Sequence, residues 1–219
     1  MENAGNVEKR HGHMNNFGIN LDISHRCTLE CSKCLRSYYK SNNAKVPGHD
    51  MTIDEYVKVI DYFKHVNFCG NVSDPVFNPN LITFLKLNYD RGITCEVHNA
   101  ATGKPLSWYK QAFEANLKAR WIFGIDGYPE DSHQYRTNQN GEALFEAMKL
   151  CAQMGLDTTW RYITFRYNED HIDDCRRIAK HYGVKFHLME SSRFVKDDPL
   201  KPTKHYVDRD YEQHLSKVY

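Results

Sequence analysis

The sequence predicts an α/β fold, a partial (β/α)6 barrel with mostly parallel strands. Short apolar runs recur along the chain, a helical pattern separates each run from the next, and glycine or proline marks many of the boundaries. Serial strand–helix–strand units of roughly 30 residues impose parallel strands joined by right-handed crossovers. The expected strands are fewer than the eight of a closed barrel, so we expect an open or partial one.

The expected strands are the short runs rich in β-branched and aromatic residues. They cover Phe17–Ile23, Val66–Cys69, Ile93–Val97, Trp121–Ile125, Thr158–Phe165 and Val184–Met189.

The first helix of the barrel is predicted over Thr52–His65, with an apolar stripe at helical spacing. It begins with a capping box, in which Thr52 and Glu55 satisfy opposite unpaired N–H groups. A second helix starts near Asn78–Pro79 and ends before Gly92, because proline suits the first turn and glycine the left-handed end. Three further helices are predicted over Ser107–Lys118, over Gly141–Met154 and from Ile172 to Gly183.

Composition narrows the class of protein. Twenty-nine basic residues balance 28 acidic ones, so a nucleic-acid partner is not expected. No run of about 18 apolar residues is present, so no membrane partner is expected either. Seven cysteines without an apolar secretory segment indicate a reducing compartment, and we expect a cytoplasmic protein. The predicted organisation is a flexible segment over 1–16, a core domain over 17–194 and a C-terminal extension over 195–219.

Directly after the first predicted strand stand Cys27, Cys31 and Cys34, in the pattern C-x3-C-x2-C. With seven cysteines in the chain, chance gives this spacing about once in a hundred such sequences. Three thiolates from one loop suit an iron–sulfur cluster. The alternative is a zinc site, which needs a fourth ligand such as His25 or Cys69. Three cysteines on four irons leave one iron open to a ligand that offers an amino and a carboxylate group.

These residues resemble the radical S-adenosylmethionine (radical SAM) superfamily, and the resemblance covers roughly residues 17–194. It is nearest to the branch related to SPASM-type peptide-modifying enzymes, without their auxiliary-cluster domain. Only Cys151 and Cys175 follow residue 95, so the chain has cysteines for one cluster. Cys69 and Cys95 are expected to pack in the core.

Further segments carry the resemblance. Residues 68–75 are similar to the family's glycine-rich segment, which implies that Gly70, Asn71, Ser73 and Asp74 bind the amino end of S-adenosylmethionine. His98-Asn99-Ala100 is similar to a "TNG" motif and implies a cofactor contact for Asn99. Gly124-Ile125-Asp126-Gly127 and Tyr135-Arg136 resemble the "S-I-D-G … Y-R" region near the ribose and the carboxylate. It implies cofactor binding by Asp126 and by Arg136, with Arg166 as the second candidate for the carboxylate.

The chain departs from the family pattern at four positions. Lys33 stands where an aromatic residue is common, Gly124 replaces a serine, and Ser73 and Ala100 replace glycines.

The resemblance implies an enzyme with two cofactors, a [4Fe–4S] cluster and S-adenosylmethionine. Reductive cleavage of S-adenosylmethionine would give a 5′-deoxyadenosyl radical, which abstracts a hydrogen atom from a substrate that the sequence does not identify, a peptide or a small molecule. An external one-electron donor of the flavodoxin or ferredoxin type is implied as partner. Two alternatives stay open: a non-catalytic metal-binding module with zinc or an iron–sulfur group, and a degenerate radical SAM protein.

Overall fold

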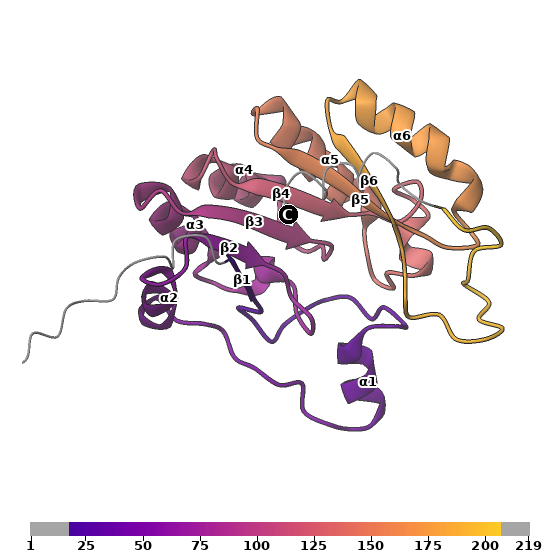
Figure 1. Cartoon of the computed structure of the whole chain (residues 1–219), viewed down its shortest axis with the longest axis horizontal. Helices are drawn as coiled ribbons and strands as arrows, with labels where there is room; N and C mark the ends of the chain where they lie inside the picture. The colour runs from indigo at the N-terminus through magenta and orange to yellow at the C-terminus, as the bar shows by residue number, and fades with distance from the viewer. Residues whose placement is uncertain (1–17, 207–219) are drawn as a thin grey trace, which may run out of the picture.

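A computed structural model describes residues 18–206, and their strands form one parallel sheet in the order β1-β2-β3-β4-β5-β6 (Figure 1). β1 and β6 are the two edges, so the barrel is open and the predicted fold is confirmed. The predicted segment 1–16, Phe17 and residues 207–219 lie outside the described part. The strands are β1 (Gly18–Leu21), β2 (His65–Phe68), β3 (Thr94–Asn99), β4 (Arg120–Gly124), β5 (Thr158–Thr164) and β6 (Lys185–Glu190).

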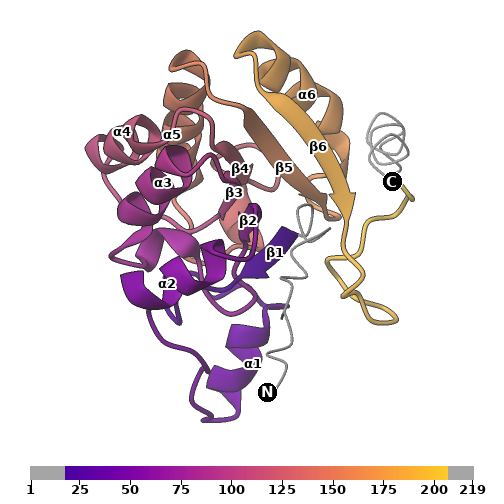
Figure 2. The same ribbon diagram turned by 60° about the vertical axis from the view of Figure 1, so that its left-hand side comes forward.

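Five α-helices connect the strands and cover one face of the sheet (Figure 2). They are α2 (Ile53–Ile60), α3 (Leu81–Asp90), α4 (Leu106–Ala115), α5 (Gly141–Gln153) and α6 (Ile172–His181). A further helix, α1 (Leu35–Ser41), lies away from the sheet, directly after the loop that carries Cys27, Cys31 and Cys34, called the cysteine loop below (Figure 1). Short 3₁₀ turns cover Pro75–Phe77, Ser132–Gln134 and Glu169–His171.

The two faces of the sheet differ sharply in polarity. On β3, Cys95 and Val97 are buried on the helix side, whereas Glu96 and His98 alternate with them and are only half-buried. A parallel sheet covered on both faces is apolar throughout, so this alternation shows that helices cover one face only. The opposite, inner face carries polar side chains toward the middle of the barrel.

Aromatic residues fill the space between the sheet and the helices. Tyr56 of α2 stacks on Phe84 of α3 at 4.1 Å between ring centroids, and its hydroxyl donates to Asn88 at 2.6 Å. Phe113 of α4 meets Trp121 of β4 edge to face at 4.9 Å. This core holds the helices on the convex side and leaves the ends of the strands to the loops.

Some boundaries differ from the predicted ones. The first predicted helix ends at Ile60 instead of His65, because His65 already pairs with Gly18 and Thr94 in the sheet. Its capping box between Thr52 and Glu55 is confirmed. The sequence did not predict α1, which is seven residues long and buries none of its side chains, and therefore has no apolar stripe to detect.

Residues 191–206 form no helix and run as turns after β6. No helix within residues 18–206 is long and apolar enough to cross a membrane.

Candidate cofactor site

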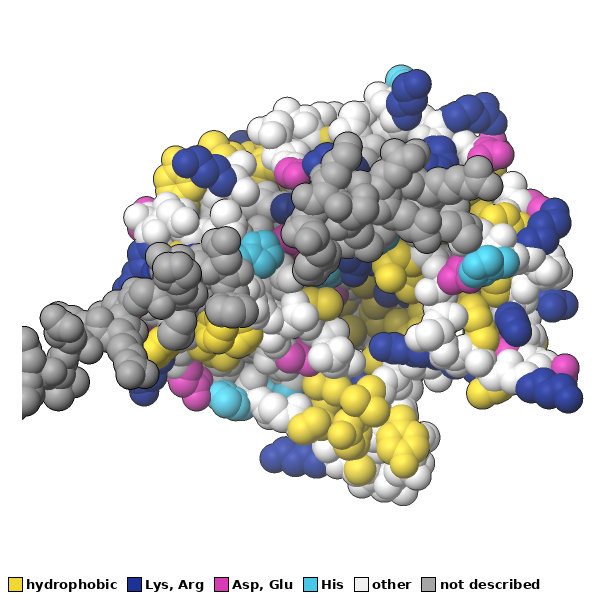
Figure 3. All heavy atoms as spheres, in the orientation of Figure 1, with side chains coloured by type: hydrophobic (Ala, Val, Ile, Leu, Met, Phe, Trp, Pro, Cys, Tyr) yellow, Lys and Arg dark blue, Asp and Glu magenta, His cyan; other side chains and the backbone are white. Residues whose placement is uncertain are grey.

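A cavity of about 360 Å³ opens where the carboxyl ends of the strands meet the cysteine loop. Figure 3 shows a hollow on this face, with hydrophobic and basic side chains in it. Most of the residues predicted for the site line the cavity: Cys27, Cys31, Cys34, Gly70, Asn71, Ser73, Asp74, Asn99 and Arg136. The assignment of each to cluster or cofactor stays a prediction.

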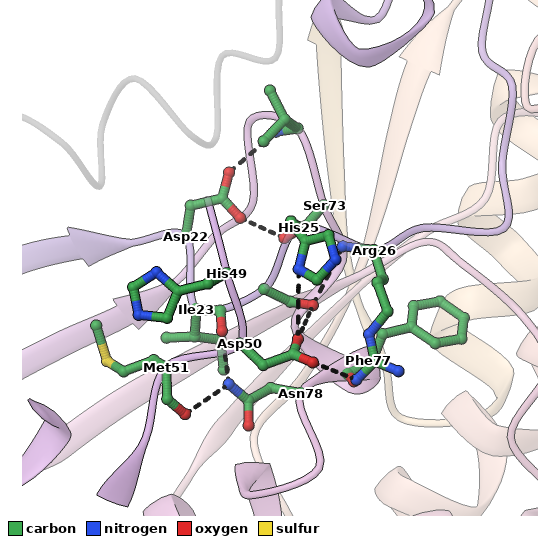
Figure 4. A network of polar contacts seen from close by, with 12 residues as sticks. Asp22, Ile23, His25, Arg26, His49, Asp50, Met51, Ser73, Phe77 and Asn78 are labelled. Carbon is green, nitrogen blue, oxygen red and sulfur yellow. Dashed lines mark hydrogen bonds and ion pairs between the residues drawn. The ribbon is translucent and has the colours of Figure 1, made fainter. Parts of the chain in front are cut away.

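The beginning of the cysteine loop is fixed by Asp50 (Figure 4). Its carboxylate accepts a hydrogen bond from Ser24 Oγ at 2.6 Å and pairs with Arg26 Nη2 at 2.7 Å. Asn78 holds the strand end just before it, donating through Nδ2 to the Ile23 carbonyl at 2.5 Å and the Met51 carbonyl at 3.1 Å. The loop therefore leaves β1 in a set direction, with Cys27 immediately after the anchored Arg26.

The three cysteine thiols face the same cavity. Cys31 is buried, and Cys27 and Cys34 are half-buried. Burial raises the pKa of Cys27 to about 12 and that of Cys31 to about 11. Cys34 Sγ lies 3.8 Å from the carbonyl oxygen of Asn71, which brings the glycine-rich segment next to the cysteines. Within residues 18–206, no three His, Cys, Asp or Glu side chains are arranged to hold a single metal ion.

Asp22, at the end of β1, organises the glycine-rich segment. Its carboxylate accepts the N–H groups of Asn71 at 2.8 Å and Val72 at 3.0 Å, and the hydroxyl of Ser73. Gly70 has no room for a side chain, since a Cβ would lie 2.2 Å from the Ser73 carbonyl oxygen. The segment is thus folded tightly against the edge of the cavity.

Asp74 and Asn99 join the loops after β2 and β3. The buried Asp74 carboxylate accepts the N–H groups of Ala100 and Ala101, each at 2.8 Å, and the Asn99 amide at 3.1 Å. Tyr109 donates to the other end of that amide at 2.7 Å. Burial raises the pKa of the Asp74 carboxyl, and the backbone N–H groups of Ala100 and Ala101 oppose the rise.

Asp126 and Arg136 form a buried ion pair, with Nε 2.8 Å from Oδ2. Asp126 is fully buried behind the cavity wall and also accepts the Ile163 N–H at 2.8 Å. Burial raises the pKa of the Asp126 carboxyl, and the guanidinium opposes that rise. Arg136 lines the cavity and Asp126 does not, so Asp126 acts on the cavity only by orienting the Arg136 side chain.

A polar chain crosses the inner face of β3, β4 and β5. Arg161 Nη1 donates to His98 Nδ1 at 2.7 Å, and His98 Nε2 lies 3.4 Å from Glu96. Arg120 pairs with the same Glu96 carboxylate at 2.9 Å. Burial, aided by the charge of Arg161, lowers the pKa of His98, while Glu96 opposes the shift. Arg161 and His98 both line the cavity.

The segment after β6 folds over the cysteine loop. Lys33 pairs with the buried Asp198 at 2.5 Å, and Arg193 Nη1 donates to the Lys33 carbonyl at 3.0 Å. Phe194 meets Phe165 edge to face at 5.7 Å. Lys33, the departure from the family pattern, therefore fastens this segment.

Arg166 is not among the residues that line the cavity. Its backbone N–H and its Nε donate to the carbonyls of Leu200 at 2.9 Å and Lys201 at 3.1 Å. Arg166, the second candidate for the cofactor carboxylate, therefore contacts the C-terminal segment and not the cavity. Arg161 is the cavity-lining arginine of β5.

Several cavity residues were not predicted. Arg161 lines the cavity, and Asp22 holds the segment at its edge. Both are charged residues inside predicted strands, a signal that was available because buried strands rarely carry such groups unpaired. Cys69 was expected in the core, but it follows the last residue of β2 and faces the cavity; Cys95 is buried as expected. Glu190, at the end of β6, also lines the cavity.

No family model matches the sequence, and no curated protein matches it. Solved structures do match the fold. SuiB from Streptococcus suis superposes with a TM-score of 0.64 at 13% identity, over 94% of this chain and 46% of SuiB. Its form bound to S-adenosylmethionine gives 0.66, also at 13% identity, over 94% of this chain and 47% of SuiB. The chain thus spans about half the length of SuiB.

Two further structures match over 92% of this chain. TYW1 with a lysine-pyruvate adduct gives a TM-score of 0.60 at 16% identity, over 72% of its own chain. The protein anSMEcpe with bound AdoMet gives 0.60 at 17% identity, over 59% of its chain. All three neighbours are radical SAM enzymes, so the resemblance inferred from the motifs is confirmed at the level of the fold. The protein has the fold of the radical SAM enzymes.

Proposed function

We propose that the protein is a radical SAM enzyme that holds a [4Fe–4S] cluster on Cys27, Cys31 and Cys34 and cleaves S-adenosylmethionine reductively. The observation that carries the proposal is that three cysteines of one loop line the same cavity as the glycine-rich segment. In an α/β barrel, this carboxyl end of the strands is where active sites lie.

The residues at the cavity fit such a cluster by donor type. Thiolates are the ligands that iron–sulfur clusters use, and three of them leave one iron for the cofactor. Raised pKa values keep the Cys27 and Cys31 thiols protonated in the metal-free protein, so loading the site releases protons. When bound, the cluster would supply the electron for cleaving the carbon–sulfur bond of S-adenosylmethionine, which generates the radical that abstracts hydrogen from the substrate.

The chain's own residues would bind and orient the cofactor. Asp22 holds the 70–73 segment, whose backbone would receive the amino group next to Cys34. Arg136 would bind the carboxylate, because a guanidinium donates a bidentate pair and Asp126 fixes its direction. Asn99 donates to the Asp74 carboxylate, which also accepts the Ala101 N–H. Asp74 and Asn99 would therefore act as positioning residues for the loop that follows β3.

The C-terminal segment would exclude water from the cysteine loop. Phe194 and Leu200 pack against an apolar cluster that includes Leu29, Cys31 and Phe165. Low water access strengthens every electrostatic contact in a site and protects reactive species.

Substrate, electron donor and compartment belong to the same proposal. SuiB has been solved with its precursor peptide SuiA and anSMEcpe with a Cp18Cys peptide, which supports a peptide as the first substrate class to test. A flavodoxin- or ferredoxin-type protein would supply the electron. A reducing cytoplasm suits the free cysteines of the chain.

Metal analysis after anaerobic purification and reconstitution tests the proposal against a zinc module. About four irons and four sulfides per chain are expected for the cluster. One tightly held zinc and no sulfide would overturn it. The matched control is Cys151→Ala, because Cys151 is buried on α5 away from the cavity lining and should keep the full iron content.

A further inference from the structure

We propose that α1 and the loop that follows it, residues 35–47, form the docking surface for the protein that supplies the electron, and that this partner is a small acidic one-electron carrier. The inference rests on the proposed function and adds to it the place where the partner binds and the charge that it carries. Residues 35–47 are called the docking surface below.

The proposed reaction takes its electron from outside the chain. Apart from Cys27, Cys31 and Cys34, the chain has four cysteines, and they are far apart in the sequence, so the chain has ligands for one cluster. A partner must therefore bring its redox group close to the cysteine loop, because the rate of electron transfer falls steeply with distance. The step moves one electron: the carrier is oxidised by one electron, the cluster is reduced by one, and no bond forms or breaks.

α1 is attached directly to the cysteine loop. It begins at Leu35, and Cys34 is the residue before it. The Cys34 carbonyl accepts the N–H groups of Ser37 at 3.0 Å and Tyr38 at 3.2 Å. The hydroxyl of Ser37 donates to the Cys31 carbonyl at 2.8 Å. Two of the three proposed cluster ligands are thus hydrogen-bonded to α1 through their backbone, which gives a carrier seated on this helix a short path to the cluster.

α1 presents apolar side chains to solvent. Leu35 is 46% exposed and Tyr38 is 63% exposed, and the two lie three residues apart, on one face of the helix. Tyr39 meets Tyr38 edge to face at 6.2 Å between ring centroids. Figure 3 shows hydrophobic side chains gathered at this end of the molecule. An apolar patch on a helix that lies away from the sheet is typical of an interaction surface.

The docking surface carries a positive charge. It contains three basic residues, Arg36, Lys40 and Lys45, and no acidic one. Glu30 pairs with Lys40 at 2.7 Å and offsets one of these charges. Arg36 donates to two backbone carbonyls, at 2.6 and 3.3 Å, so its bonds leave its charge in place, and Lys45 is exposed. A positive surface of this kind attracts a partner of negative charge and speeds its binding.

A second copy of the chain fits this surface less well than an acidic carrier does. In a two-fold dimer the same surface contacts itself, which would bring the positive charges of two chains together. The surface is also small, a helix of seven residues and the loop after it. Electron-transfer complexes are held by small interfaces, whereas stable dimers bury more area. Size and charge together favour a carrier that binds briefly and leaves.

A flavodoxin of negative net charge is the probe that tests the proposal on the reconstituted protein. Calorimetry with oxidised flavodoxin gives the affinity, because no electron is transferred. Freeze-quench electron paramagnetic resonance with fully reduced flavodoxin gives the rate at which the cluster is reduced. We expect a micromolar dissociation constant at low salt that weakens as salt rises, because ions screen the attraction between exposed charges. Dithionite serves as the reductant that needs no docking surface.

Tyr38→Ser and Lys45→Glu should each weaken the affinity for flavodoxin at least tenfold and slow its reduction of the cluster. Both variants should keep the iron content and the rate of reduction by dithionite. Tyr62→Ser and Lys64→Glu are the matched controls and should behave as the wild type. Tyr62 is 65% exposed, and both control residues lie between α2 and β2, at the end of the sheet opposite to the cysteine loop.

An unchanged affinity for flavodoxin in Tyr38→Ser and Lys45→Glu overturns the inference. An equal loss in the two control variants does so as well, since flavodoxin would then respond to the overall charge of the protein. Sedimentation checks the other occupant: a wild-type dimer that Tyr38→Ser converts to a monomer would assign the docking surface to a second copy of the chain.

Failure of this inference is distinct from failure of the proposed function. A protein that holds no iron and sulfide, or that dithionite reduces without any cleavage of S-adenosylmethionine, fails the proposed function. A protein that cleaves S-adenosylmethionine with dithionite, and takes electrons from flavodoxin equally well in the wild type and in both docking-surface variants, keeps the function and loses the docking surface.

Discussion

Gly124 and Arg136 fit each other: a Cβ on Gly124 would lie 2.8 Å from Arg136 Nη2 and 3.1 Å from its Cζ. The guanidinium lies over the glycine and reaches Asp126 at 2.8 Å. Gly124 stands where the family pattern has a serine, and in this chain the Arg136 guanidinium occupies the space that a side chain at this position would need. The backbone of Gly124 is not in the left-handed region, so glycine is required here by the lack of space for a side chain and not by the backbone conformation.

Gly124→Ala should therefore displace Arg136 and weaken S-adenosylmethionine binding. The tip of an arginine moves easily on a free surface, but here the ion pair between Nε and Asp126 restrains the guanidinium, so we expect the methyl group to strain that pair. Loss of one charge-assisted contact predicts about a tenfold weaker dissociation constant, measured by equilibrium dialysis on protein with full iron content. Gly92→Ala is the control, since its φ of 65° costs stability and its Cβ meets nothing within 4 Å. An unchanged affinity for S-adenosylmethionine in Gly124→Ala would show that Arg136 does not depend on the space at Gly124.

Arg136→Gln alone should destabilise the protein as well as weaken the cofactor. Removing one partner leaves the fully buried Asp126 uncompensated, which costs about 3–5 kcal/mol in the free energy of unfolding. Adding Asp126→Asn should restore much of that stability and none of the cofactor affinity. Denaturant unfolding and dialysis separate the two effects. A double variant that recovers both would mean that Arg136 acts on the fold only.

Asp22→Ala should loosen the 70–73 segment without reducing the iron bound by the three cysteines. The carboxylate holds the N–H groups of Asn71 and Val72 at 2.8 and 3.0 Å, and both lose their acceptor. We expect faster amide exchange at these two residues, a weaker affinity for S-adenosylmethionine by about tenfold and unchanged iron. Slow exchange at Asn71 in the variant would contradict the role given to Asp22.

The C-terminal segment should come loose in acid. Lys33 lowers the pKa of Asp198, so their ion pair contributes above the ordinary pKa of an aspartate and is lost as the pH falls through the lowered value. Limited proteolysis should cut within residues 193–201 more readily below about pH 4, where aspartates protonate. Asp198→Asn should show that sensitivity already at pH 7. If Asp198→Asn resists proteolysis at pH 7 as well as the wild type does, the Lys33–Asp198 ion pair does not hold the C-terminal segment in place.

The fold followed from the sequence because its signals are local and repeated. Apolar runs such as Trp121–Ile125 and glycine-ended helices recur along the chain, and the capping box at Thr52 is a contiguous pattern. The cysteine triplet is contiguous in the same sense. Sequence alone therefore predicted the partial barrel of parallel strands and the cysteine triplet that follows its first strand.

What the sequence did not predict depends on contacts between distant segments. Asp22 meets residues 71–73, and Lys33 meets Asp198, across separations that no local pattern encodes. Arg161 lies in the middle of β5, and only the packed structure shows that it lines the cavity and bonds His98. Arg166 and Arg161 flank one strand end, and chain order does not decide which of them turns inward.

The measurement that tests the account most directly is formation of 5′-deoxyadenosine from S-adenosylmethionine by the anaerobically reconstituted protein under strong reductant. Wild-type protein is expected to form it together with methionine, and Cys31→Ala is expected to lose iron and product together. A wild-type protein that holds about four irons and still leaves S-adenosylmethionine intact would contradict the account.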